Sequence, residues 1–203
     1  MSETVTPRTF LQSLEAMAND APAQGYALRD ILDRLDERAF GAGLFVLALP
    51  CAIPFLWGVP QIVALPMLFL TLQMLSGRSE PWLPQRMGAR MIDKDGLSRT
   101  TKFGRKWFGW LETISNPRLL FLSSRPMEPV LALFLTVFSS SILIPLPGTN
   151  TVPGIAVAIV AFGLMARDGI LIFLGLVIGS AWISALVFGG SQVLGYITGL
   201  LGG

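Results

Sequence analysis

Two long stretches of the chain, residues 40–76 and 129–166, contain no charged residue. At about 1.5 Å per residue, each is long enough for two thin helical passes through a membrane. Proline removes a backbone hydrogen-bond donor and crowds the preceding turn, so several prolines cannot lie inside one regular helix. The sequence therefore predicts two broken or re-entrant helical hairpins. The breaks contain Pro50, Pro54, Gly58, Pro60 and Pro66 in the first stretch and Pro145, Pro147, Gly148 and Pro153 in the second.

Lipid is the expected solvent around these hairpins. Of the 203 residues, 52% are hydrophobic and only 14% are charged, whereas about a quarter of the residues of a soluble domain are charged. The mean hydropathy is +0.62, and a third charge-free run, residues 169–188, is long enough to span a bilayer. We expect an all-α integral membrane protein that crosses the membrane several times.

Residues 1–39 predict amphipathic helices that are cytosolic or lie at the membrane surface. Their apolar side chains recur at helical spacing, and the basic residues among them alternate with acidic ones, as is typical of a solvated helix face. The opening residues are polar and acidic without an apolar run, so we expect no removable signal peptide. The apolar positions are Phe10, Leu11, Leu14 and Met17, followed by Leu28, Ile31, Leu32 and Leu35.

Residues 77–128 form a basic interfacial segment between the two hairpins. They hold ten of the fifteen Lys and Arg residues and only five acidic residues. Such an excess of positive charge is typical of cytoplasmic loops. Aromatic residues such as Trp107 and Trp110 accompany Lys102 and Lys106, a pattern that indicates an interfacial helix. Residues 129–203 then form the second broken hairpin and a C-terminal transmembrane helix.

The two hairpins predict an internal repeat, for which an inverted arrangement is one alternative. When Arg78 is aligned with Arg167, each half reads as an apolar run, a Pro/Gly break, a second apolar run and an arginine. A helix broken at membrane depth leaves backbone groups free, and these are tolerated only where they are buried in protein or face water. The alignment places Trp57, Gly58 and Gln61 beside Gly148, Thr149 and Asn150.

Several kinds of chemistry are excluded by composition. The chain contains no histidine, so it has no His general base, no Ser-His-Asp triad and no His-ligated zinc or haem. The acidic residues of the central segment lack the spacing of a metal-binding loop. The single cysteine, Cys51, lies in an apolar run and is expected to be a buried, inert thiol. We expect no enzyme activity, no cofactor and no metal site.

Paired breaks in two halves of a transporter mark a substrate site, because half-helix ends offer partial charges to a solute. The alternative is that prolines and glycines merely allow membrane helices to pack closely. On the first reading, Asn150 is the main side-chain ligand; on the second, it caps a helix and satisfies its own backbone. Gln73 is expected to form an interhelical hydrogen bond. The predicted solute-binding residues are Asn150, Gly148, Thr149, Thr151, Pro54, Gly58, Gln61 and Gln73.

Six charged residues near the ends of the apolar runs are further candidates. Arg78 and Arg167 end such runs, where they either reach toward headgroups or contact a solute. Asp168 is expected to pair with its neighbour Arg167, and it is the first candidate for a proton site if transport is coupled. Glu112 and Arg118 are expected to form an ion pair that pins the interfacial segment. The complete set is Arg78, Glu80, Glu112, Arg118, Arg167 and Asp168.

Several motifs resemble those of the ExoD family of exopolysaccharide-synthesis membrane proteins, over roughly residues 29–190. The resemblance implies an inner-membrane protein linked to exopolysaccharide production, without an established enzymatic activity. The residues that carry it are Pro54, Gln73-Met74-Leu75-Ser76-Gly77-Arg78, Pro81-Trp82-Leu83-Pro84, Asn116-Pro117-Arg118, Pro145-Leu146-Pro147-Gly148-Thr149-Asn150 and Arg167-Asp168-Gly169.

Two functions remain open from the sequence. The first is a small transporter or channel-like protein for a polar or ionic solute, with the lipid bilayer as its surroundings and a homodimer as its expected assembly. The second is a non-transporting assembly or regulatory subunit of the exopolysaccharide machinery; no nucleic-acid partner is expected. In a homodimer, small residues would line a close helix contact, namely Gly175, Gly179, Ser180, Ser184, Gly189 and Gly190.

Overall fold

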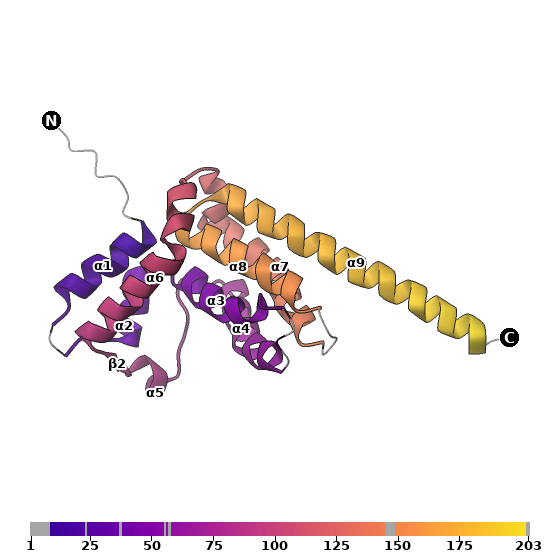
Figure 1. The fold of residues 1–203 in the computed structure, drawn as a ribbon, viewed down its shortest axis with the longest axis horizontal. Helices are drawn as coiled ribbons and strands as arrows, with labels where there is room; N and C mark the ends of the chain where they lie inside the picture. The colour runs from indigo at the N-terminus through magenta and orange to yellow at the C-terminus, as the bar shows by residue number, and fades with distance from the viewer. Residues whose placement is uncertain are drawn as a thin grey trace.

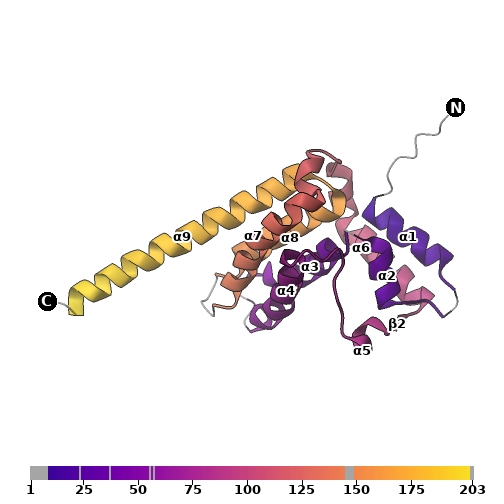
Figure 2. The same ribbon diagram turned by 180° about the vertical axis from the view of Figure 1, so that it is seen from behind.

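The protein is all-helical apart from one short β-ladder, as Figure 1 shows for the computed structural model. The described residues are 9–22, 24–36, 38–54, 56, 58–144 and 149–201, with only the backbone described for 192–201. The predicted all-α class is confirmed. One group contains α3 (Arg38–Cys51), α4 (Val59–Leu75), α7 (Glu128–Ile142) and α8 (Thr151–Ala166), which lie together beside the first part of α9 (Gly169–Leu201). A second group contains α1 (Phe10–Asp20), α2 (Leu28–Leu35) and α6 (Lys94–Ile114). Figure 2 shows the same arrangement from behind.

The N-terminal group contains the two predicted amphipathic helices. Helix α1 begins with a capping box, in which the Thr9 side chain accepts from the backbone of Gln12 and the Gln12 side chain accepts from the backbone of Thr9. A two-stranded antiparallel ladder, which the sequence analysis did not predict, joins this group to the basic segment. The elements are α1 (Phe10–Asp20), β1 (Tyr26–Ala27), α2 (Leu28–Leu35), α5 (Gln85–Gly88), β2 (Met91–Ile92) and α6 (Lys94–Ile114).

Both charge-free stretches fold as helix, break and helix. In the first, the helix ends at Cys51 and the chain turns before helix resumes at Val59. Gly58 makes that turn with a φ of 77°, a left-handed conformation that favours glycine. The four helices have 14 to 17 residues, or about 21–26 Å, which is shorter than a hydrocarbon core of about 30 Å. They are α3 (Arg38–Cys51), α4 (Val59–Leu75), α7 (Glu128–Ile142) and α8 (Thr151–Ala166).

The two hairpins pack against each other. Helix α3 of the first hairpin packs against α8 of the second, and α4 packs against α7. A Cβ added to Gly154, near the start of α8, would lie 2.7 Å from the backbone carbon of Cys51, at the end of α3. The two breaks therefore meet at the same end of the bundle. The hairpins point in the same direction, and the inverted arrangement considered from the sequence does not occur in this fold.

Helix α9 (Gly169–Leu201) is the longest element, and it extends beyond the hairpins toward the C-terminus (Figure 1). Among the described residues, it contains the one helical stretch long and apolar enough to cross a membrane, Gly169–Ser191, with a mean hydropathy of 2.5. Only 17% of the most apolar 18 residues of this stretch are buried, unlike the core helix of a soluble domain. The apolar side chains of α9 therefore need lipid or another protein to cover them.

Two of the glycines expected at a homodimer contact are used within the chain. A Cβ at Gly175 would lie 2.6 Å from the Val160 side chain of α8, and one at Gly179 would collide with the ring of Phe138 on α7. These glycines let α9 approach the hairpins closely. Gly189 and Gly190 have open space around them, and Ser184 is exposed, so only this outer part of the predicted contact is free for a second copy.

Two short 3-10 helices, η1 (Leu120–Ser123) and η2 (Arg125–Met127), connect the basic segment to the second hairpin. The core lies where the hairpins and the start of α9 meet. Its largest fully buried side chains include Phe138, Leu44, Met67 and Leu135. Cys51 is also buried and unbridged, as expected from its place in the apolar run.

Candidate functional site

Two carboxamides, one after each break, lie where a helix begins, and the oxygen atom of each is buried. Gln61 is in the first turn of α4, and Asn150 directly precedes α8. The Oε1 atom of Gln61 and the Oδ1 atom of Asn150 are both buried, and neither has a hydrogen-bond partner among the described residues. Both residues lie at the same sequence distance before the arginines aligned in the repeat, Arg78 and Arg167. The aligned halves thus present the same chemical group in the same unusual state.

Asn150 is not a side-chain cap in this structure. It occupies the N-cap position of α8, but its side chain makes no capping hydrogen bond. Gly58, at the corresponding end of α4, has no side chain with which to cap. Neither helix is therefore capped by the side chain of its own N-cap residue. This geometry does not favour the alternative in which Asn150 serves only its own backbone.

Two buried hydroxyls on α7 add to this unpaired polarity. Ser139 is fully buried, and its Oγ atom has no hydrogen-bond partner among the described residues; the same holds for Oγ1 of Thr136. An unpaired buried polar group costs about 1–3 kcal/mol, and most such groups are satisfied in native proteins. Their neighbours Ser140 and Ser141 instead donate to carbonyls of the preceding turn, at Thr136 and Phe138. Ser139 and Thr136 were not among the residues singled out from the sequence.

Contacts along the chain place Gln61 and Asn150 at the same end of the bundle. The Cys51 thiol lies 3.9 Å from the carbonyl oxygen of Pro60, which directly precedes Gln61. The Cys51 backbone also abuts Gly154, whose N–H donates to the carbonyl of Asn150 at 3.0 Å. Carboxamide oxygens and hydroxyls at this end of the bundle are suited to a hydrogen-bonding solute or a weakly charged ion.

The other residues predicted at the breaks differ in exposure. Pro54 and Gly58 are exposed, whereas Thr149 and Thr151 are partly buried. Gly148 lies outside the described residues. The named residues of the first break are thus more exposed than those of the second, although both breaks lie at the same end of the bundle.

Gln73 lies at the opposite end of α4 from the breaks, and its amide is occupied. The Nε2 atom of Gln73 donates to the carbonyl of Trp82 at 3.3 Å, and the N–H of Trp82 donates to Oε1 of Gln73 at 2.5 Å. The prediction that Gln73 forms an interhelical hydrogen bond is therefore wrong, because its partner Trp82 belongs to an irregular segment. Gln73 ties the segment after α4 to the helix, apart from Asn150.

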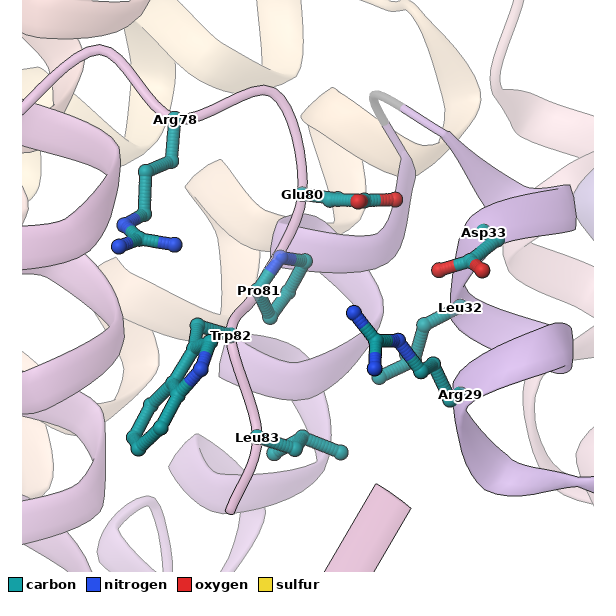
Figure 3. Close-up of a pocket in the computed structure, with 8 residues that line it drawn as sticks. All are labelled: Arg29, Leu32, Asp33, Arg78, Glu80, Pro81, Trp82 and Leu83. Carbon is teal, nitrogen blue, oxygen red and sulfur yellow. The ribbon is translucent and has the colours of Figure 1, made fainter. Parts of the chain in front are cut away.

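Arg78 and Glu80 line a pocket of about 80 Å³ between α2 and the segment that follows α4 (Figure 3). Arg29 and Asp33 of α2 complete its charged wall. Figure 3 shows the carboxyl groups of Glu80 and Asp33 facing each other across the pocket. Repulsion by the carboxylate of Asp33 is the main cause that raises the pKa of Glu80, whereas the positive charge of Arg29 lowers it. From the sequence, Arg29 and Asp33 were predicted only as part of the alternating charges on a solvated helix face within residues 1–39.

Asp168 pairs with Arg118 and not with Arg167, contrary to the sequence-based expectation. The Nε atom of Arg118 lies 3.3 Å from Oδ2 of Asp168, and the N–H of Asn116 donates to the same oxygen at 3.0 Å. The N–H of Ile170 donates to Oδ1 at 3.0 Å, so Asp168 also caps α9. The Asp168 side chain is fully buried, while that of Arg118 is 46% exposed. The carboxylate joins the end of the basic segment to the start of α9.

Glu112 caps a different helix, so its expected ion pair with Arg118 is also wrong. Oε1 of Glu112 accepts from the N–H of Leu11 at 2.8 Å, in the first turn of α1. This places a negative charge at the positive end of that helix. Glu112 and the exposed Arg167 both line a second pocket of about 380 Å³, together with Arg38 and Asn116. The charged candidates thus lie at the N-terminal side of the bundle, away from the two breaks.

The architecture defines a class of protein with two packed hairpins of short apolar helices, a long exposed apolar helix and a polar N-terminal group. The chain belongs to the family described as exopolysaccharide synthesis, ExoD, whose match covers residues 10–188. The resemblance noted from the sequence is confirmed. Family membership links the chain to exopolysaccharide synthesis, and together with α9 it supports association with a membrane.

Two relatives illustrate the similarity. An uncharacterized protein from Synechocystis sp. (strain ATCC 27184 / PCC 6803 / Kazusa) is 31% identical over 152 residues, covering 74% of this chain and 72% of the relative. Protein ExoD from Rhizobium meliloti (strain 1021) is 28% identical over 170 residues, covering 81% of this chain and 70% of the relative. No solved structure matches the chain.

Proposed function

We propose that this protein is a multi-pass protein of the bacterial inner membrane that conducts or transports a small polar or ionic solute in exopolysaccharide synthesis. One observation carries the proposal: Gln61 and Asn150 occupy aligned positions in two apolar hairpins, and each has a buried carboxamide oxygen without a partner. Polar groups at membrane depth are costly unless they are paired or wet. A solute that hydrogen bonds to both carboxamides would satisfy them.

The hairpins would form two repeats related by a rotation about the membrane normal, because they point in the same direction. Their short helices would enter the bilayer from the cytoplasmic side and return to it, and α9 would span it. The protein would act as a homodimer in the lipid bilayer, so that two copies enclose the pathway, and it would bind no nucleic acid. In this role it moves a solute and catalyses no reaction.

The test is a flux assay with purified protein in liposomes, using protons, sodium, chloride and a neutral sugar as separate probes. We expect at least one probe to cross faster than in empty liposomes. Asn150→Leu should reduce that flux about tenfold, which corresponds to about 1.4 kcal/mol of lost interaction. Gln61→Leu should act in the same direction.

A matched pair on α7 provides the control. Ser139→Ala removes a buried hydroxyl without a partner, whereas Ser140→Ala removes an exposed one that is bonded to its own helix. We expect reduced flux only from the first variant. If Asn150→Leu inserts normally and keeps full flux, the carboxamides are not ligands and the transport proposal is wrong.

The alternative is a non-transporting assembly or regulatory subunit of the exopolysaccharide machinery. It is favoured by the exposed basic and aromatic face of α6, which includes Lys102 and Trp107. On this alternative, substitutions on α6 would abolish exopolysaccharide production while Asn150→Leu would not. The two functions are separated by measuring production in cells that carry each variant.

A further inference from the structure

Helix α6 has one face that packs inside the molecule. Leu97 and Thr101 are buried, and a Cβ at Gly104 would lie 2.9 Å from the Leu11 side chain of α1. Further along, the ring of Phe108 packs edge-on against Phe45 of α3, with 5.1 Å between ring centroids. This inner face attaches α6 to both the N-terminal group and the first hairpin. These contacts fix which side of α6 faces outward.

The opposite face of α6 is exposed, aromatic and basic. Phe103, Trp107 and Trp110 have 56–59% of their surface exposed, although large aromatic side chains are usually at least half buried in soluble proteins. They follow the i, i+4, i+7 spacing of one helix face. Arg99, Lys102 and Lys106 are exposed beside them at i, i+3, i+7 spacing, which also keeps them on one face.

Along the helix, the basic side chains of this outer face have one acidic neighbour, Asp95, which lies one turn before Arg99. Residues 96–111 contain no Asp or Glu, and the described ion pairs of the chain use Arg105, Arg118 and Arg125 instead. Arg105 reaches across to Glu15 of α1, on the inner side of the helix. Lys106 lies 5.9 Å from the ring centroid of Trp107, a cation–π distance that keeps the positive charge at the aromatic surface.

The apolar surface continues from α6 to the start of α9. Leu119, Leu120 and Phe121 follow α6 and are 55–67% exposed. The carbonyl of Arg118 accepts from the N–H of Gly169 at 2.8 Å, which fastens this segment to the first residue of the long apolar helix. Figure 1 shows α6 running across the direction of α9. A surface helix has this orientation when a neighbouring helix crosses the bilayer.

We propose that the outer face of α6 binds anionic phospholipid headgroups, with Phe103, Trp107 and Trp110 at the level of the headgroups and Arg99, Lys102 and Lys106 on the phosphates. Lipid suits this face better than a protein partner, because the face carries three basic residues against one acid, Asp95, and is continuous with the apolar start of α9. Aromatic rings prefer the membrane interface, and clustered basic residues prefer anionic lipid. This binding does not depend on any transported solute.

The lipid preference can be measured with the full chain in nanodiscs of phosphatidylcholine mixed with phosphatidylglycerol. The readout is the enrichment of phosphatidylglycerol around the protein, followed with spin-labelled lipids. Replacing Arg99, Lys102 and Lys106 by Gln should reduce that enrichment about tenfold or more, since each basic residue near the surface contributes to attraction of anionic lipid. Arg86→Gln with Arg90→Gln is the control, because both arginines are exposed on the same basic segment but lie outside α6.

The position of the aromatic residues is tested separately by fluorescence quenching. The chain has five tryptophans, so the signal of Trp107 and Trp110 is the difference between wild type and the double variant W107L/W110L. Lipid brominated near the headgroup should quench this difference more strongly than lipid brominated deep in the chain. A melting curve in detergent verifies that each variant is folded. Unchanged lipid enrichment in the Gln variant, or a difference signal that brominated lipid does not quench, would overturn the proposal in favour of a protein partner.

Discussion

Asp168 illustrates how one buried charge is satisfied in this chain. Two backbone N–H groups and the guanidinium of Arg118 donate to its two carboxylate oxygens. Asn116 and Arg118 lie 52 and 50 residues before Asp168 in the sequence, and Ile170 lies in the first turn of α9. A buried carboxylate is tolerated when its oxygens are hydrogen bonded in this way. The geometry suits a structural connection, and the role of Asp168 as a proton site stays a prediction.

Asp168→Asn should destabilise the protein by about 1.5–3 kcal/mol, the range for hydrogen bonds to a charged group. The amide keeps one acceptor but also places an N–H₂ group where donors converge. Thermal unfolding in detergent measures the loss. Arg118→Gln should cost less, since that side chain is 46% exposed and Asp168 keeps its backbone donors. If Asp168→Asn keeps full stability but loses proton-coupled flux, Asp168 is a proton site and not a structural tie.

Glu80 predicts a pH dependence with a defined sign. Its pKa is raised, chiefly by the charge of Asp33, so the folded protein binds this proton more tightly than the unfolded chain. The charged Glu80 carboxylate therefore destabilises the folded protein at a pH above the folded-state pKa of Glu80. This destabilisation is lost as the pH falls through that pKa toward the unfolded-state value. Glu80→Gln should raise the melting temperature at neutral pH and have a smaller effect in acid.

The opposite substitution tests the same charges. Arg29→Gln removes the positive charge that lowers the pKa of Glu80, so it should lower the melting temperature at neutral pH. Melting curves recorded from neutral to acidic pH give both differences. Equal effects of Glu80→Gln at every pH would contradict the assigned repulsion.

At the scale of elements, close helix approach depends on glycine. Helix α8 meets the end of α3 at Gly154, where an added Cβ would lie 2.7 Å from Cys51. Gly154→Ala should therefore destabilise the contact by about 1–3 kcal/mol, the usual cost of overpacking. A Cβ at Gly109 on α6 would lie 3.6 Å from the Arg105 side chain, an ordinary contact, so Gly109→Ala should be neutral or stabilising by up to about 1 kcal/mol. Thermal unfolding of both variants distinguishes a real close contact from a general glycine effect, which would give equal shifts.

The short helices of the hairpins also have a consequence for their depth. With 14 to 17 residues each, they cannot cross a full hydrocarbon core without thinning it. Their breaks would therefore lie within the bilayer or near its far side. There, Gln61 and Asn150 would be screened from bulk water.

At the scale of the whole molecule, the fold predicts that the two termini lie on opposite sides of the membrane. Both hairpins return to the side from which they start, and α9 is the single described helix long enough to span. In a Cys51→Ala background, cysteines at Lys94 and Arg99 should react with an impermeant thiol reagent only after the cells are opened. A reporter fused after Leu201 should be exported. Labelling of intact cells at Lys94, or a cytoplasmic reporter, would contradict this topology.

Much of the element pattern followed from the sequence, because its causes are local. Clustered prolines and glycines favour helix ends, so the breaks around Gly58 and before Thr151 were predicted from residue type alone. The prediction went too far at Pro50 and Pro66, which lie inside α3 and α4. The helical spacing of apolar residues likewise predicted α1 and α2, and the combination of aromatic and basic residues indicated α6. The family resemblance rested on short contiguous motifs, which are also local.

The tertiary structure decided which groups meet. Asp168 is adjacent to Arg167 in sequence, yet α8 ends there in a left-handed turn, and the carboxylate faces Arg118 instead. Gln73 bonds to Trp82, and Glu112 caps α1, because the segments between the hairpins fold back onto them. The direction of the hairpins and the burial of Gln61 and Asn150 also depend on packing between distant segments. Local residue patterns indicate which segments form helices, but they carry no information about such long-range contacts.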